Sequence, residues 1–147
     1  MTTGDPNRNR TLSEQYSDVP QPVLDGLFEA AVGRQGWAEA LQRTARHFRS
    51  EAAVMVSYND TSEVTVGSEE IVELGHRYNE EGWAIRDVRA RAAMSLRRQA
   101  VIVDQDIGAL EDLVRTPFYA DFMGPAGYAW HAAVKFQAGG RLWALSF

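Results

Sequence analysis

The fold is decided by the stretch "YAWHAAVKFQAGGRLWALSF", residues 128–147. In its first part, "YAWHAAVKF" (128–136), large apolar residues alternate with small or polar ones, and this period of two is that of a β-strand. The next residues, "QAGG" (137–140), supply the glycines of a tight turn, after which "RLWALSF" (141–147) alternates again. The stretch therefore predicts an antiparallel hairpin.

Alternation puts two sets of side chains on opposite faces of this hairpin. On one face of the first strand we expect Tyr128, Trp130, Ala132, Val134 and Phe136, and on one face of the second strand we expect Trp143, Leu145 and Phe147. This face carries the aromatic side chains of the hairpin. We therefore expect their face to turn toward the helices and the core.

Three more strands and several helices precede the hairpin. The runs "AAVMVSY" (52–58) and "EVTV" (63–66) are rich in β-branched residues and flank a turn at Asn59 and Asp60, and "AVIVD" (100–104) is a strand by composition. Apolar residues at helical spacing predict helices at 22–31, 37–49, 69–80, 87–97 and 117–123, with shorter helical turns at 107–114.

This order of elements predicts an α+β domain with a single antiparallel five-stranded sheet flanked by helices. We place the domain at residues 21–147. Residues 1–20 are rich in Pro, Asn, Ser, Thr and charge, so we expect a flexible N-terminal segment that cannot offset its own ordering entropy.

Composition excludes several classes of function. The 147 residues carry a formal net charge of −5, which is the wrong sign for a domain that neutralises many phosphates by itself. The absence of cysteine excludes disulfides, cysteine-based metal sites and thiol nucleophiles. No apolar run reaches the length of a membrane span, and the first residues lack the apolar core of a signal peptide, so we expect a cytoplasmic protein with no membrane partner.

Three stretches carry a resemblance to a known family: "LFEAAVGRQGWAEAL" (27–41), "RTPFYADFMGPAGYAWHAAV" (115–134) and "GGRLWALSF" (139–147). Together they resemble the N-terminal sensory domain of LuxR-type bacterial transcriptional regulators, which has a PAS/GAF-like fold. The resemblance covers about residues 22–147. It implies a regulatory domain that binds a small-molecule signal and forms a homodimer. It also implies that DNA is bound only through a C-terminal helix-turn-helix domain, which these residues do not include.

Some members of that family bind acyl-homoserine lactones between the sheet and the middle helices. These members share a Trp, a Tyr four residues later, and an Asp-Pro nine residues after the Tyr. Tyr78 and Asp87 have the second of these separations, so the resemblance implies that they hydrogen-bond an amide-bearing ligand. The chain departs from the pattern at two positions, because Leu74 stands in place of the Trp and Val88 in place of the Pro.

We expect the ligand to be small and largely apolar and to lie between the sheet and the helices. The candidate ligand-binding residues are the aromatic and acidic side chains of these elements: Tyr58, Tyr78, Trp83, Asp87, Phe118, Phe122, Trp130 and Trp143. A structural interpretation stands beside this one. Tyr78 and Trp83 also suit an ordinary core, and Asp87 suits the N-cap of the next helix.

Other functions have less support in the sequence. Glu69, Glu73, His76 and Glu80 share one helical face, but a carboxylate metal site needs a second matching helix, so we expect a solvated face and no metal. No nucleotide-binding or serine-hydrolase motif occurs, and we predict no cofactor and no catalytic residue. The alternatives are a small enzyme of the ketosteroid-isomerase kind, with Asp87 or Asp121 as base, and a pure dimerisation module.

Overall fold

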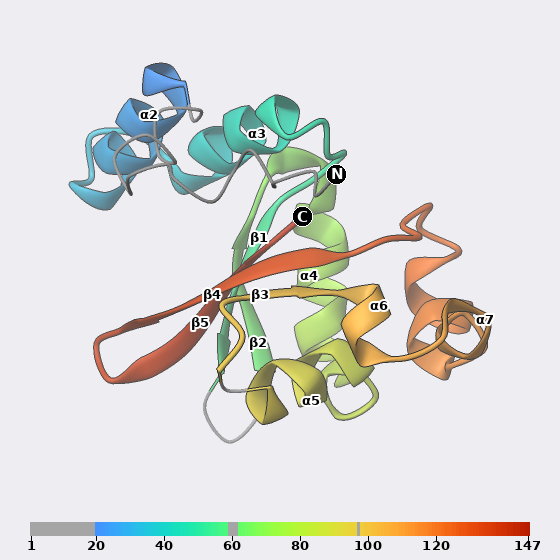
Figure 1. Cartoon of the computed structure of the whole chain (residues 1–147). Coiled ribbons are helices and arrows are strands. Elements are labelled where there is room, and N and C mark those ends of the chain that lie inside the picture. Colours follow the sequence, from blue (N-terminus) through green and yellow to red (C-terminus); the bar gives the residue numbers. More distant parts are fainter. Residues whose placement is uncertain (1–19, 59–61, 97) are drawn as a thin grey trace, which may run out of the picture.

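A computed structural model describes residues 20–58, 62–96 and 98–147. The predicted α+β architecture is confirmed: one five-stranded antiparallel sheet is flanked by helices (Figure 1). The predicted flexible segment, up to residue 19, and the predicted turn at Asn59 and Asp60 lie outside the described residues.

The strand order of the sheet is β2-β1-β5-β4-β3. Its strands are β1 (Val54–Tyr58), β2 (Ser62–Gly67), β3 (Val101–Val103), β4 (Ala132–Ala138) and β5 (Arg141–Ser146). The predicted hairpin is β4–β5, and Phe136 lies opposite Trp143 in its register. Because β5 also pairs with β1, the end of the chain occupies the centre of the sheet and joins its two halves.

Two groups of helices cover the sheet (Figure 1). The first is the pair α2 (Gln21–Ala31) and α3 (Trp37–His47). The second comprises η2 (Glu69–Ile71), α4 (Val72–Glu80), η3 (Trp83–Ile85), α5 (Val88–Ser95), α6 (Asp104–Ile107), α7 (Leu110–Leu113) and the π-helix η4 (Phe118–Met123). Figure 1 shows α4 to α7 together on one side of the sheet, which we call its inner face.

Each face of the sheet has its own core. On the inner face, Val56 and Ala144 pack with Ala90 and Ala93 of α5. On the outer face, Leu41 of α3 packs in a smaller cluster together with Ala45, Ala53 and partly buried residues of β1, β2 and β5. The α3 helix covers only part of the outer face, so the β4–β5 hairpin extends beyond it.

The prediction for the faces of the hairpin was wrong. Strand β4 begins at Ala132, so Tyr128 and Trp130 precede it, and Trp130 is 64% exposed. Within β4 the buried residues are Ala133 and Lys135, while Val134 and Phe136 are exposed. Trp143 shares the outer face with Phe136.

The reason lies in the contacts that Ala133 and Lys135 make on the inner face. Ala133 packs there with Ala90 and Ala93 of α5 and with Ile102, its partner on β3. Lys135 reaches the C-terminal end of α5, where Nζ donates to the backbone carbonyl oxygens of Ala93, at 3.0 Å, and of Leu96. An ammonium group at the carbonyl end of a helix satisfies acceptors that the helix itself leaves unpaired. This contact turns the aromatic face of β4 outward.

A third cluster joins the helices to one another. Phe118 is fully buried at its centre and packs edge-on against Tyr78, Trp83 and Tyr119. Gly82 ends α4 with φ of 70°, a backbone conformation that favours glycine, and η3 then places Trp83 under Phe118. This aromatic cluster forms the floor under the site described below.

Candidate functional site

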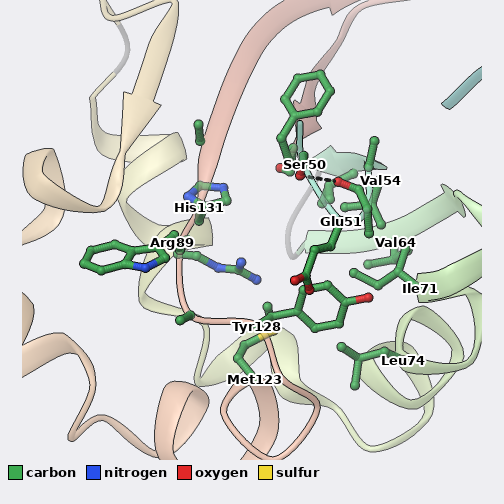
Figure 2. Close-up of a pocket in the computed structure, with 18 of the residues that line it drawn as sticks. Ser50, Glu51, Val54, Val64, Ile71, Leu74, Arg89, Met123, Tyr128 and His131 are labelled. Atoms are coloured by element: carbon green, nitrogen blue, oxygen red, sulfur yellow. Dashed lines mark hydrogen bonds between the residues drawn. The ribbon is translucent and has the colours of Figure 1, made fainter. Parts of the chain in front are cut away.

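A pocket of about 860 Å³ lies between the inner face of the sheet and the helices α4 and η4. Pockets of this volume are typical of small-molecule sites. Its walls are mostly apolar, and the residues that form them include Val54, Val64, Ile71, Leu74 and Met123 (Figure 2). The walls extend to the end of β5, where Ser146 and Phe147 lie.

Asp87 is the centre of a polar cluster on one wall of this pocket. It caps α5, because Oδ1 accepts from the backbone N–H groups of Arg89, at 2.9 Å, and of Ala90, at 3.4 Å. The Arg89 side chain donates through Nε to Oδ1 at 3.1 Å and through Nη2 to Oδ2 at 3.3 Å, and the Tyr78 hydroxyl donates to Oδ2 at 3.1 Å. The capping role predicted for Asp87 is confirmed. The lone pairs of its carboxylate are also fully used.

Arg89 is held in place from two sides. Its guanidinium carbon lies 4.4 Å from the ring centroid of Phe118 and 6.0 Å from that of Tyr119, both at cation–π distance. Burial opposes its charge, but the carboxylate of Asp87 outweighs burial and raises the pKa of the guanidinium. Figure 2 shows the Arg89 side chain extending into the pocket. Within the described part of the chain, its Nη1 has no hydrogen-bond partner.

Two tyrosine hydroxyls lie beside this ion pair. Burial, with help from the charge of Asp87, raises the pKa of Tyr58 to about 12 and also raises the pKa of Tyr78, so both are neutral phenols. Since the Tyr78 hydroxyl donates to Asp87, the Ser62 hydroxyl is left to donate to Tyr78. The Tyr58 side chain is 8% exposed, and no described group hydrogen-bonds its hydroxyl.

A second carboxylate lies behind the pocket wall. Asp104, 2% exposed, accepts a hydrogen bond from the Tyr119 hydroxyl at 2.6 Å and has Nδ1 of His131 at 3.5 Å. Burial opposes its charge, but His131, Tyr119 and Arg89 together hold the pKa of Asp104 below its ordinary value. Burial lowers the pKa of His131, whose side chain is only 7% exposed. In the described residues, Nδ1 of His131 makes no hydrogen bond.

Five of the eight candidate ligand-binding residues line the pocket: Tyr58, Tyr78, Asp87, Phe122 and Trp130. The other three lie elsewhere. Trp83 and Phe118 belong to the aromatic cluster beneath, and the indole N–H of Trp83 donates to Glu81 at 2.7 Å. Trp143 lies on the outer face, where its indole N–H donates to the carbonyl oxygen of Ala138 at 3.1 Å.

Arg89 and His131 also line the pocket, and neither was predicted from the sequence to lie there. Arg89 follows the helix-capping Asp87 by two residues, and this Asp-x-Arg spacing at the start of a helix is a signal that could have identified it. His131 gave no such signal. Its side chain reaches the inner face because the alternation of β4 is opposite to the predicted one.

The acidic helical face singled out in the sequence is solvent-exposed in the structure. No group of three or more His, Asp or Glu side chains gathers among the described residues, and Glu69, Glu73, His76 and Glu80 are all exposed. In the same residues, no helix has the length and apolar character needed to cross a membrane.

Comparison with known proteins gives a structural neighbour. No protein-family model and no curated protein matches the chain. Among solved structures, the chain is similar to the LBD (ligand-binding) domain of VqsR from Pseudomonas aeruginosa, with a TM-score of 0.64 and 23% identity. The match covers 85% of this chain and 76% of that one. At this identity the likeness shows the α+β fold alone.

The buried His131 predicts how stability depends on pH. The pKa of His131 is lowered in the folded state. Below about pH 6.5, the His131 imidazole is therefore protonated in the unfolded chain while it stays neutral in the folded chain. The stabilisation is therefore complete above that pH and is lost as the pH falls. We expect the free energy of unfolding to decrease by up to about 1 kcal/mol from pH 7 to pH 5.5 through this group.

Urea titrations at a series of pH values measure this slope in the original protein and in His131→Asn. The substitution should flatten it. A His131→Asn variant that keeps the full slope would contradict the assignment to His131.

Proposed function

We propose that this chain is a non-catalytic sensory domain of a LuxR-type transcriptional regulator, and that it binds a small, largely apolar molecule in the pocket beneath the sheet. One observation carries the proposal. The pocket joins apolar walls to a polar end at which the buried Nδ1 of His131 has no hydrogen-bond partner among the described residues. A closed core would have no use for a buried polar atom without a partner, because leaving one unpaired costs about 1–3 kcal/mol.

The likeness to the VqsR domain supports this proposal at the level of fold, since that domain is named a ligand-binding domain. The resemblance of the sequence to sensory domains points the same way. For this chain, the LuxR-type family, the cytoplasmic location and the DNA-binding output through a separate helix-turn-helix domain are parts of the proposal.

The walls of the pocket suggest how binding would be sensed. They come from the sheet, from α4 and from η4, so a ligand contacts elements that are far apart in the sequence. A ligand that binds one arrangement of these elements more tightly than another shifts the population by the ratio of the two affinities. A DNA-binding domain would read that shift.

The arrangement of the carboxylates gives little support to an enzyme. A general base needs a lone pair that faces the substrate. Both oxygens of Asp87 are occupied by donors, and Asp121, the other candidate base, is exposed and does not line the pocket.

We propose further that the domain forms a homodimer through the outer face of the sheet. Val101 and Val134 are neighbours in the register of that face, and both are exposed, as is Phe136. An apolar surface of this kind on a sheet favours association.

We expect Phe136→Glu to weaken dimerisation at least tenfold in sedimentation equilibrium. An original protein that stays monomeric at about 100 micromolar would contradict the proposal.

The test of ligand binding uses a neutral apolar fluorophore, N-phenyl-1-naphthylamine. We expect the full chain to bind one molecule with enhanced emission, and we expect Val54→Trp, which places an indole in the pocket, to weaken binding at least tenfold. The control is Phe28→Ala, which removes a side chain that is 62% exposed and lies on α2, away from the pocket. Equal binding by the original protein and Val54→Trp would refute a site in the pocket.

A further inference from the structure

The helical segment formed by η2 and α4 lies closely against strand β2. A Cβ atom added at Gly75 of α4 would lie 2.9 Å from Cγ1 of Val64, and one added at Gly67 of β2 would lie 2.9 Å from Cγ2 of Ile71. Neither glycine has a positive φ. What both positions require is therefore the absence of a side chain between the helical segment and the strand.

A second contact at Val64 ties α4 to the sheet. The backbone N–H of Val64 donates to Oδ1 of Asn79 at 3.0 Å, and its carbonyl oxygen accepts from Nδ2 of Asn79 at 2.8 Å. The strand order places β2 at the edge of the sheet, where backbone groups on the free side need partners. The Asn79 amide thus pairs with Val64 as a neighbouring strand would. Gly75 and Asn79 are four residues apart, so both lie on the face of α4 that meets Val64.

This contact forms part of the pocket wall. Val64 and Gly75 line the pocket together with Leu74 and Tyr78 of the same helix. Figure 2 shows Val64 and Ile71 next to each other on one wall. Val64 also packs against both the aromatic cluster and the core of the inner face. The separation between α4 and β2 therefore sets the position of this wall.

A methyl group at position 75 would displace α4 rather than Val64. Apolar atoms pack at about 3.5–4.0 Å, so a contact at 2.9 Å forces one partner to move. Val64 is the stiffer partner, because its side chain is β-branched and its backbone is paired with Val56 of β1. Helix α4 would move away from the sheet and carry Leu74 and Tyr78 with it, which widens the pocket.

We infer that Gly75 and Asn79 determine the shape of ligand that the pocket accepts, because they hold α4 against Val64 and so fix the width between this helix and the sheet. The inference rests on the proposed function and adds the residues that set its specificity. Both are positioning residues, since they act through the place of α4 and of the side chains that α4 carries into the pocket.

Two ten-carbon alcohols of different shape test the inference by displacing N-phenyl-1-naphthylamine from the full chain. They are 1-naphthol, which is flat, and 1-adamantanol, which is globular. We expect Gly75→Ala to shift the ratio of their displacing concentrations in favour of 1-adamantanol by at least about threefold, since one methylene in an apolar pocket changes affinity by about tenfold or more. Asn79→Ala removes the clamp at an exposed position and should shift the ratio in the same direction.

The matched control is His76→Ala. His76 is the exposed neighbour of Gly75 on α4 and does not line the pocket. Its substitution should leave the ratio unchanged. If Gly75→Ala does not fold, the ratio measured for Asn79→Ala decides.

Urea unfolding tests the contact at Gly75 without a ligand. Alanine is a better helix former than glycine, so Gly75→Ala would raise the urea midpoint if position 75 were open. We expect a lower midpoint, because the added methyl group meets Val64. Val64→Ala removes Cγ1 and leaves Cβ at 3.7 Å, an ordinary contact. In that background, Gly75→Ala should raise the midpoint instead.

The two levels of the proposal fail in different ways. If the fluorophore binds but either folded variant, Gly75→Ala or Asn79→Ala, keeps the original ratio of the two alcohols, the inference is overturned while the ligand-binding function stands. A higher urea midpoint for Gly75→Ala in the original protein would overturn it as well. If the fluorophore does not bind in the pocket at all, both the inference and the proposed function are overturned.

Discussion

The buried pairing of Asp87 with Arg89 is the interaction on which the rest of the site depends. One carboxylate caps α5, holds the guanidinium of the same helix and accepts from Tyr78 of α4. The guanidinium in turn packs on Phe118 of η4. Removing one member of such a pair leaves the other charge buried and unpaired, which is strongly destabilising. The pair thus fixes three helical elements around the pocket.

The Asp87–Arg89 pair both stabilises the fold and positions a side chain that faces the pocket. The pair orients Arg89 so that one edge meets Asp87 and another faces the pocket. A guanidinium whose rotamer is locked by packing on Phe118 and by two hydrogen bonds to Asp87 is pre-organised for a ligand. The aromatic floor under it, from Trp83 to Phe118, excludes water from one side. The cluster is therefore rigid where it meets a ligand, while the other pocket walls come from separate elements.

The sequence predicted the elements well and the faces of the central hairpin poorly. Alternation in "YAWHAAVKF" identified a strand, but alternation alone cannot tell which face is buried. The usual assumption, that large apolar residues face inward, failed because Lys135 of the same strand reaches the C-terminal end of α5 on the inner face, which leaves Val134 and Phe136 on the other face. This contact spans about forty residues of sequence, and no local pattern encodes it. Tyr78 and Asp87, in contrast, are only nine residues apart, on α4 and at the start of α5, so the sequence could predict that their side chains meet.

The central claim is that the space beneath the sheet is a preformed ligand site. The most direct test is a crystal structure of the full chain grown with N-phenyl-1-naphthylamine. The account predicts density for the fluorophore between the sheet and α4, against Val54 and Leu74. A pocket filled by its own side chains, such as Tyr128 or Met123, with no density for the fluorophore at saturation, would contradict it.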